Sequence, residues 1–334
     1  MKVISALKEI KQGKLPNVGY MFKKIWDYAG KYSIEYGISR IFLFIDYFIC
    51  ALVYGCAGDD YFTFKFFLIN HRGKKKFVTL LYQDKFEATH TNKEQVAIAD
   101  DKEKTLHVFS DYIERDWCGI RYNNADENFN SFYEKHKLGV IKPPCGHGGA
   151  GVEIINIREK FSNGLQLKKY CNSHGFLIEE IIPQHENISK IFPNSINTIR
   201  MISLNGRCIG AAMRMGVGEA NVDNAHAGGI YAEVDVKEGV IVSEALSDKT
   251  SSKFIRHPTT GTIIPGSLIP YWDECKDLVK NASKLLPDVC LLGWDIAITP
   301  NGPTIVEVNN RPGLGLVQAP NGHGLKAEFE KIKD

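Results

Sequence analysis

A lysine and a group of glycines stand close together in residues 139–157, GVIKPPCGHGGAGVEIINI. Gly146, Gly148 and Gly151 match GxGxxG, but a dinucleotide fingerprint needs a helix directly after the glycines, and a strand pattern follows here. Two strands joined by a glycine loop predict a flap whose backbone amides wrap phosphate oxygens, with the ammonium of Lys142 on the same phosphates. A glycine hairpin without a ligand is the alternative.

A second group of chemically competent residues lies in GWDIAITPNGPTIVEVNNRPG, residues 293–313. Two short strands flank the turn Pro-Asn-Gly-Pro at 300–303, so Asp295 is expected to face Glu307 and Asn309 across the hairpin. Opposed carboxylates repel unless a cation lies between them, and oxygen ligands without Cys or His favour Mg²⁺ over zinc. The alternative is an exposed acidic hairpin.

Two weaker signals lie near these segments. FLIEEIIPQHE, residues 176–186, is an apolar strand that runs into Glu179 and Glu180, and such a strand end can offer backbone groups and apolar walls to an adenine ring. An ordinary strand end gives the same pattern. Arg311 follows the hairpin and is placed to bind a substrate carboxylate through its guanidinium.

The elements that must position these residues change character near Lys137. Residues 1–58 have a helical pattern with interleaved basic and aromatic side chains, and residues 59–135 continue as mixed, mainly helical sequence. Short β-like runs then follow, separated by Gly, Pro and Asn, with helices expected at about 160–174 and 271–286. The second half is therefore predicted to be α+β and dominated by antiparallel sheet.

Composition restricts the class of protein. The chain has 334 residues, 44% of them hydrophobic, and a formal charge of +2, which supplies no broad field for nucleic acid or an acidic membrane. The eight cysteines form no CxxC pair, which favours reduced thiols in a cytoplasm. The apolar run 41–57 carries Asp46 near its middle, so we expect a buried or interfacial helix that does not cross a bilayer.

Taken in chain order, these features resemble an ATP-grasp catalytic domain over about residues 100–315. The resemblance rests on Lys142 with its flap, the Glu179-Glu180 pair, the arginines of NTIRMISL and GAAMRMG, and the hairpin of Asp295. It is closest to the sugar-transfer-associated ATP-grasp group, on DYF near residue 60, DK at 101–102, and HPTTG and IPGSLIPYW within 257–272.

The resemblance implies a nucleotide site made of several segments. It implies phosphate contacts from Lys102, Lys142, Gly148 and Gly149, adenine contacts from Glu179, Glu180 and Ile182, and a ribose contact from Glu186. Two departures leave alternatives open, because Lys104 competes with Lys102 and His185 could replace Glu186.

The resemblance also implies the catalytic residues. Asp295, Glu307 and Asn309 would hold one or two Mg²⁺, and Arg200, Arg214 and Arg311 would serve the phosphoryl and carboxylate groups. On the acceptor side we place Asn224, His226 and His257, for which a loop turn and a capping histidine are the alternatives.

The implied architecture is an ATP-grasp fold that holds the nucleotide between two α+β lobes. We expect a mainly helical region at 1–99 and a catalytic domain at 100–334, with a central lobe of about 100–182 and a C-terminal lobe of about 183–334. The implied reaction is ATP- and Mg²⁺-dependent joining of a carboxylate to an amine through an acyl phosphate. A small-molecule kinase and a nucleotide-binding protein without catalysis are the alternatives.

The implied partners are a carboxylate substrate, such as a sugar acid of a polysaccharide or glycoconjugate precursor, and an amine donor such as an amino acid. We expect no nucleic acid, a cytoplasmic location and peripheral contact with the membrane through residues 1–58. Neither the exact substrates nor the oligomeric state follows from the sequence.

Overall fold

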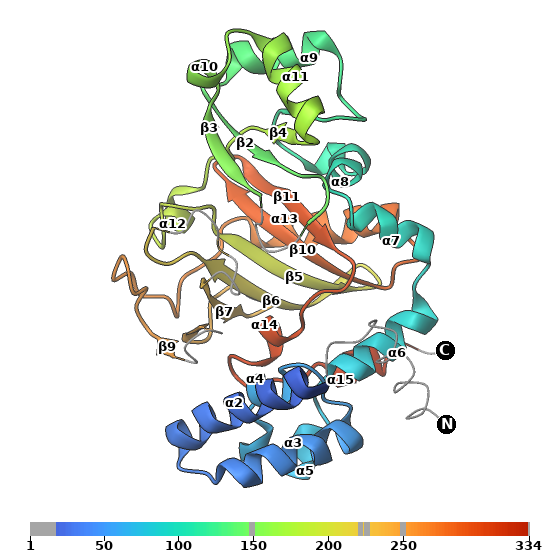
Figure 1. The fold of residues 1–334 in the computed structure, drawn as a ribbon, viewed down its shortest axis with the longest axis vertical. Coiled ribbons are helices and arrows are strands. Elements are labelled where there is room, and N and C mark those ends of the chain that lie inside the picture. Colours follow the sequence, from blue (N-terminus) through green and yellow to red (C-terminus); the bar gives the residue numbers. More distant parts are fainter. Residues whose placement is uncertain (1–17, 147–150, 220–222, 224–227, 248–251, 333–334) are drawn as a thin grey trace. The chain divides into compact units, whose positions relative to one another are not determined.

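The structure, a computed structural model, describes residues 18–146, 151–219, 223, 228–247 and 252–332. The chain divides into two compact units, Met1–Lys85 and Phe86–Asp334, whose elements are shown in Figure 1. The domain boundaries expected at 99/100 and 182/183 stay predictions.

The N-terminal unit consists of helices. They are α2 (Val18–Tyr36), α3 (Arg40–Tyr54), α4 (Asp60–Thr63), the 3-10 turn Phe66–Leu68, α5 (His71–Lys74) and the start of α6 (Leu80–His90). The hydroxyl of Ser39 caps the first turn of α3, and Gly55 ends the helix at a φ of 71°, a conformation that glycine adopts without steric cost. The ring of Phe62 stacks on Tyr28 and Tyr32 at centroid distances of 5.4 and 5.1 Å. The predicted N-terminal helical region is confirmed.

No helix among the described residues is both long enough and apolar enough to cross a bilayer.

Two short helices open the C-terminal unit, α7 (Lys93–Ala99) and α8 (Lys102–Val108), followed by the 3-10 turn Ser110–Tyr112. Asp101 caps α8, because its Oδ1 accepts hydrogen bonds from the backbone N–H groups of Glu103 and Lys104 at 3.1 and 3.2 Å. Arg121 donates to the same carboxylate at 2.6 Å. This cap places Lys102 at the first residue of the helix.

A four-stranded antiparallel sheet forms the first layer of this unit. Its strands are β1 (Trp117–Cys118), β2 (Leu138–Lys142), β3 (Glu153–Asn156) and β4 (Leu177–Glu179), in the order β1-β4-β2-β3. Helices α9 (Asp126–Lys135), α10 (Ile157–Lys160) and α11 (Gly164–His174) gather beside it in Figure 1. Their buried side chains, among them Phe129 and Leu167, share one core with Ile178 of the sheet.

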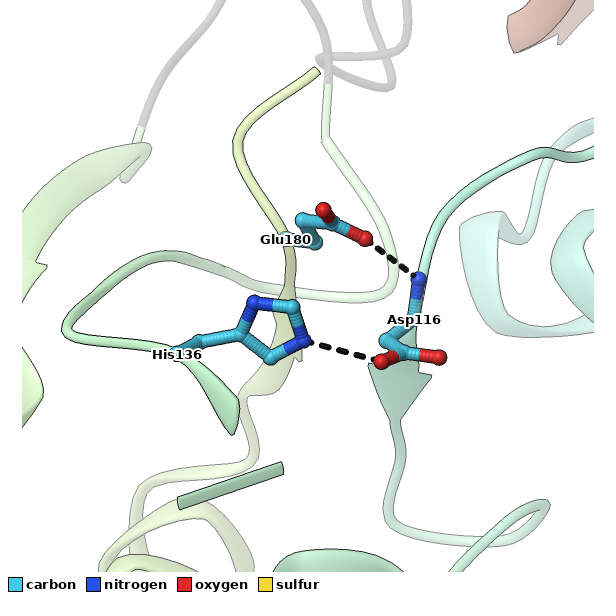
Figure 2. A group of neighbouring side chains, drawn as sticks. All are labelled: Asp116, His136 and Glu180. Carbon is cyan, nitrogen blue, oxygen red and sulfur yellow. Dashed lines mark hydrogen bonds and ion pairs between the residues drawn. The ribbon is translucent and has the colours of Figure 1, made fainter. Parts of the chain in front are cut away.

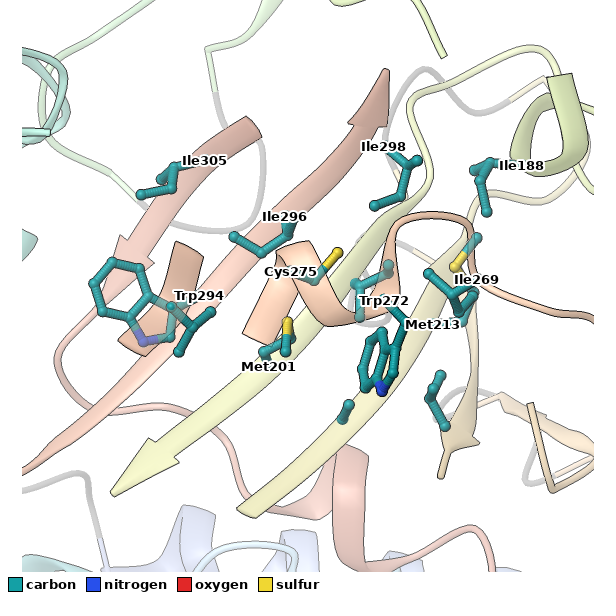
Figure 3. Close-up of a cluster of buried hydrophobic side chains, with 14 of the residues drawn as sticks. Ile188, Met201, Met213, Ile269, Trp272, Cys275, Trp294, Ile296, Ile298 and Ile305 are labelled. Carbon is teal, nitrogen blue, oxygen red and sulfur yellow. The ribbon is translucent and has the colours of Figure 1, made fainter. Parts of the chain in front are cut away.

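A seven-stranded antiparallel sheet forms the second layer, in the order β11-β10-β5-β6-β7-β8-β9. Its strands are β5 (Thr198–Leu204), β6 (Arg207–Met215), β7 (Ile230–Val234), β8 (Ala245–Ser247), β9 (Lys253–Phe254), β10 (Leu291–Thr299) and β11 (Gly302–Asn309). Helix α13 (Trp272–Ala282) packs against the sheet, and Figure 3 shows Trp272 and Cys275 among the buried side chains of β5, β6 and β10. Short helices complete the unit: α12 (Glu186–Ser189), the 3-10 turn Ser283–Leu285, α14 (Gly315–Gln318) and α15 (Lys326–Phe329).

The sequence pattern predicted most of this arrangement. The short β-like runs from 138 onward are strands, and the helices expected at about 160–174 and 271–286 are α11 and α13. The expectation that residues 59–135 are mainly helical is wrong at Trp117–Cys118, which pairs with Glu179 and Ile178 of β4.

Candidate functional site

A cleft of about 830 Å³ lies between the two sheets of the C-terminal unit. Its walls come from β2, β3 and β4 on one side and from β5, β6, β10 and β11 on the other. Eleven of the residues expected at the site line it: Lys102, Lys142, Glu179, Glu180, Ile182, Arg200, Arg214, Asp295, Glu307, Asn309 and Arg311. The fold thus brings into one cleft residues that are spread over two hundred positions of the sequence.

Buried charges join the two walls at Glu179, the last residue of β4. Its carboxylate receives Arg115 Nε at 2.6 Å and lies 2.6 Å from Lys142 Nζ. Arg115 also donates to the backbone carbonyls of Ile305 and Val306 on β11, at 2.6 and 3.3 Å. Glu179 therefore connects the small sheet with the strand that carries Glu307.

The same network sets the protonation of its members. Burial alone would raise the pKa of Glu179, but the charges of Arg115 and Lys142 outweigh burial and hold that pKa below its ordinary value. Burial lowers the pKa of Lys142, although Glu179 beside it favours the ammonium form. An anionic phosphate near Lys142 would favour its charged form further.

The segment of residues 179–182, which we call the hinge, leaves the end of β4, and its second residue, Glu180, points to a different set of partners. Its carboxylate accepts a hydrogen bond from the backbone N–H of Asp116 at 3.0 Å, and the Asp116 carboxylate in turn lies 2.9 Å from His136 Nε2 (Figure 2). These three side chains are close enough to ligate a metal ion together, but Lys135 Nζ also lies 3.2 Å from Asp116. We interpret the group as a polar link between the hinge and the start of β1.

Two arginines converge on one carboxylate deep in the cleft. Arg200 holds Asp295 through two hydrogen bonds, at 2.5 and 2.9 Å, and Arg214 adds a third at 2.8 Å. Arg214 also lies 3.1 Å from Asp223, which accepts hydrogen bonds from the backbone N–H and the hydroxyl of Thr198. Burial opposes the charge on Asp295, but the two arginines outweigh it and hold its pKa far below the usual range.

The hairpin of β10 and β11 has the expected register. Asp295 lies directly opposite Glu307, and Gly293 lies opposite Asn309. Glu307 Oε1 lies 3.3 Å from Lys102 Nζ, which also donates to the carbonyl of Gly146 at 2.6 Å. Lys102 thus joins the hairpin to the start of the glycine flap.

The oxygen donors of the hairpin suit a magnesium ion. Glu307 and Asn309 line the cleft, and the buried Nδ2 of Asn309 has no hydrogen-bond partner among the described residues, as is also true of Arg214 Nε. Hard oxygen ligands beside unsatisfied donors fit a site for a cation and phosphate oxygens. The oxygens of Asp295 already accept hydrogen bonds from Arg200 and Arg214, so in this structure its charge is balanced by arginine.

Several expected site residues lie elsewhere or cannot be placed. Gly148, Gly149, Asn224 and His226 fall outside the described residues. The side chain of Glu186 is 76% exposed and lies 3.6 Å from Lys190, whereas Gln184 lines the cleft. His185 caps α12 through its ring nitrogen, and Lys104 is not among the residues that line the cleft.

His257 is buried and is not among the residues that line the cleft. Its Nε2 lies 2.8 Å from the carbonyl of Gly216, and its ring stacks on Phe192. Burial lowers the pKa of this histidine, which favours the neutral ring. Its Nδ1 accepts a hydrogen bond from the backbone N–H of Thr259 at 3.2 Å, which matches the capping alternative, and the acceptor role of His257 stays a prediction.

Sequence reasoning missed two charged residues of the site. Arg115 lies in a segment that was expected to be helical, and its partners are 64 and 190 positions away. Asp223 has no sequence signal beyond its closeness to NAHAGG. Neither residue could have been found without the strand pairing that brings its partners together.

Comparison with known proteins decides the family. A family model described as sugar-transfer associated ATP-grasp matches residues 81–334, well over half of the chain. The chain belongs to the sugar-transfer associated ATP-grasp family. Its architecture is accordingly an ATP-grasp fold with α+β content and an N-terminal helical region, as predicted.

Three solved structures that resemble this ATP-grasp chain share at most 15% of its sequence. The ATP-grasp ligase PsnB, complexed with a minimal precursor, is 13% identical, with a TM-score of 0.45 over 78% of this chain and 68% of its own. The D-alanine–D-alanine ligase from Bacillus anthracis is 15% identical, with a TM-score of 0.42 over 74% of this chain and 69% of its own. The D-cycloserine synthetase DcsG is 13% identical, with a TM-score of 0.43 over 75% and 77%. Among curated proteins, none matches the sequence.

Proposed function

We propose that this ATP-grasp chain is an ATP- and Mg²⁺-dependent ligase that joins a carboxylate to an amine with formation of ADP. The observation that carries the proposal is the arrangement around Asp295, where two buried arginines meet the hairpin that bears Glu307 and Asn309. Transfer of a phosphoryl group needs positioning and neutralisation of charge more than a protein nucleophile. A cleft lined by cations and by hard oxygen ligands offers both.

The nucleotide would lie across the cleft, with its phosphates toward Lys102 and Lys142. The hinge residues from Glu179 to Ile182 would line the adenine, with their backbone groups facing the ring because the carboxylate of Glu179 is engaged with Arg115. Glu186 is too exposed to be a strong candidate for the ribose, and Gln184 is the better placed polar side chain.

The first step would form an acyl phosphate. An oxygen of the substrate carboxylate attacks the γ-phosphorus of ATP, the bond from that phosphorus to the bridging oxygen breaks, and ADP leaves. Arg200 and Arg214 would neutralise the charge on the transferring group. Asp295, Glu307 and Asn309 would hold Mg²⁺, which when bound supplies charge neutralisation at the phosphate oxygens.

The second step would form the product. The amine nitrogen attacks the acyl carbon, a C–N bond forms, the bond from that carbon to the phosphate oxygen breaks, and the nitrogen loses a proton. Arg311 lines the cleft just past the hairpin, where it would hold the substrate carboxylate before activation.

The substrates follow from the family only as a class. Its association with sugar transfer supports a sugar acid or a similar acceptor of a surface polysaccharide or glycoconjugate precursor, joined to an amino acid. A cytoplasmic location, with peripheral membrane contact through the N-terminal helices, completes the proposal.

The test is trapping of the intermediate. The protein is incubated with ATP, Mg²⁺ and candidate carboxylates, with and without hydroxylamine, and Glu307→Gln serves as the inactive control. A hydroxamate that depends on ATP supports the ligase. A stable phosphorylated hydroxyl product shows a kinase instead, and nucleotide binding without either product shows a binding protein, so each of these two outcomes would refute the proposal.

A further inference from the structure

Helix α3 of the N-terminal unit turns apolar side chains away from its own core. Its six most exposed side chains, with exposed fractions between 50 and 88%, are all apolar: Ile41, Phe42, Ile45, Ile49, Leu52 and Val53. Positions 41, 45, 49 and 53 follow one another at one helical turn, so they form a continuous stripe. In a helix that simply covers a core, this side would be polar.

The opposite side of α3 carries its polar contacts. Asp46 accepts a hydrogen bond from the hydroxyl of Tyr61 at 2.8 Å and lies 3.7 Å from Lys74 Nζ. Tyr47 and Cys50 on the same side are buried. The carboxylate of Asp46, which argued against a membrane span, therefore faces the protein. The outward stripe carries no charged side chain.

Helix α2 extends the apolar stripe with aromatic rings. Phe22 stacks on Phe48 of α3 at 5.2 Å, and Trp26 meets Phe44 edge-on at the same distance. Phe22 and Trp26 are themselves 42 and 38% exposed. Arg40 lies 4.2 Å from the ring of Trp26. Exposed aromatic rings beside a cation are typical of surfaces that enter the headgroup region of a bilayer.

Much of the exposed apolar surface of the described residues belongs to the N-terminal unit. Half of the large hydrophobic side chains that are exposed in the described part of the chain lie between Tyr20 and Val53. Single exposed apolar residues are ordinary on a soluble protein, but a contiguous group of them marks a site of interaction.

The two units differ in net charge, and the charge of the N-terminal unit favours an anionic partner. Residues 1–85 hold 14 Lys and Arg against 7 Asp and Glu, a formal charge of +7, whereas the rest of the chain holds 27 against 32, a charge of −5. The total of +2 had argued against attraction to an acidic membrane, and the division into units reverses that argument for the N-terminal unit. A second copy of this chain would bring a like charge of +7 against it, which disfavours self-association through this surface.

We propose that the α2–α3 surface, made of the six exposed apolar side chains of α3 with Phe22 and Trp26 of α2, binds the interface of a bilayer that contains anionic lipid. Helix α3 has 15 residues and is about 22 Å long at 1.5 Å per residue, shorter than the roughly 30 Å of a hydrocarbon core. It would lie in the plane of the interface, with its stripe among the acyl chains and the cations of the unit near the headgroups. This inference rests on the membrane contact included in the proposed function and makes it specific, but it uses no step of the ligase reaction, so its failure would leave that reaction untouched.

The experiment is co-sedimentation of the full chain with vesicles of phosphatidylcholine alone and of phosphatidylcholine with phosphatidylglycerol, at low and high salt. The test variant is Ile45→Gln/Ile49→Gln. The matched control is Ile255→Gln/Ile263→Gln, which alters two isoleucines of the C-terminal unit that are exposed to a similar degree, 57 and 50% against 54 and 50%. All four positions are on the surface, and thermal unfolding checks that each variant folds.

We expect binding to the anionic vesicles that weakens with salt, a loss of at least about tenfold in the test variant, and little change in the control. Equal binding by the test variant and the wild type would overturn the proposal, as would the absence of binding to anionic vesicles. Light scattering supplies a further check. A wild-type dimer that Ile45→Gln/Ile49→Gln converts to a monomer would show an interface between copies and would also overturn it.

Discussion

The two units of this chain handle burial in opposite ways. The N-terminal unit exposes an apolar stripe on α3 and half-buries Asp60. The carboxylate of Asp60 accepts hydrogen bonds from the backbone N–H groups of Ala57 and Leu80, and its charged neighbours include Asp59 and Asp84. Burial raises the pKa of Asp60 to about 6. In the C-terminal unit, by contrast, the buried carboxylates of Glu179 and Asp295 each lie against two cationic side chains.

The difference between the two units reflects function rather than stability. Enclosing paired charges costs desolvation free energy, and replacing such pairs by apolar residues is often neutral or stabilising. Exposing apolar side chains to water is also unfavourable. Stability alone explains neither feature, whereas the proposed binding of phosphate groups would explain the first and the proposed lipid partner would explain the second. Four substitutions test this comparison.

The largest effect is expected for Glu307→Gln. It keeps the shape of the side chain and removes the negative charge of a carboxylate that we propose as a ligand of Mg²⁺. Turnover should therefore fall by about 10³-fold or more. Because this side chain is 31% exposed, the melting temperature without nucleotide should hardly change. Steady-state kinetics and thermal unfolding provide the measurements. Glu274→Gln, at an exposed position of α13, is the control, and wild-type turnover with intact magnesium dependence in Glu307→Gln would exclude the metal role.

Glu179→Gln should have the largest effect on stability. It leaves Arg115 and Lys142 buried beside a neutral amide, and breaking such a pair costs about 3–5 kcal/mol. Urea unfolding measures the loss. The control, Glu153→Gln, removes a carboxylate of β3 that is 61% exposed and lies 3.9 Å from Lys160, and it should cost less than about 1 kcal/mol. A similar loss in the free energy of unfolding for both variants would show that the buried network contributes no more to stability than an exposed ion pair.

Arg200→Met should separate chemistry from binding. If Arg200 acts mainly as the phosphoryl group transfers, the rate should fall about 10²- to 10³-fold, or about 3–4 kcal/mol, while ATP affinity stays nearly normal. Single-turnover rates and nucleotide titration measure the two effects. Arg207→Met, on the exposed end of β6, controls for loss of an arginine. A collapse of ATP affinity in step with the rate would instead make Arg200 a ground-state ligand or a structural partner of Asp295.

The smallest effect, and the one with opposite sign, is expected for Asp60→Asn. The pKa of Asp60 is raised from 3.8 to about 6, so the folded protein retains a proton that the unfolded chain has lost, and the stability of the wild type falls as pH rises through this window. The asparagine keeps an acceptor oxygen and has no charge to bury. At pH 7 the variant should be more stable by at most about 3 kcal/mol, because one pKa unit corresponds to about 1.4 kcal/mol.

Calorimetry at pH 5 and pH 7 checks this prediction, and the advantage of Asp60→Asn should shrink at the lower pH. A variant that is less stable than the wild type at pH 7 would show that the charged hydrogen bonds to Ala57 and Leu80 matter more than desolvation. The contrast with Glu179→Gln would then disappear.

Much of the fold and part of the site could be predicted because the signals are short-range. Short β-like runs bounded by Gly, Pro and Asn indicated the strands, and a turn at 300–303 placed Asp295 opposite Glu307, since a hairpin fixes its own register. The ribose assignment to Glu186 had no such support. A short helix begins at that residue and exposes its side chain, while Gln184 reaches the cleft.

The sequence by itself determined the family, the strands of the second half and the composition of the cleft, because these depend on neighbouring residues and on residue type. Only the tertiary structure decided which charges are paired: Arg115 meets Glu179 across 64 positions, and Arg200 meets Asp295 across 95. It also decided which side of α3 faces outward. The sequence shows that residues 41–53 are apolar on most sides, and the packing of Tyr61 and Lys74 around Asp46 determines which side remains outside.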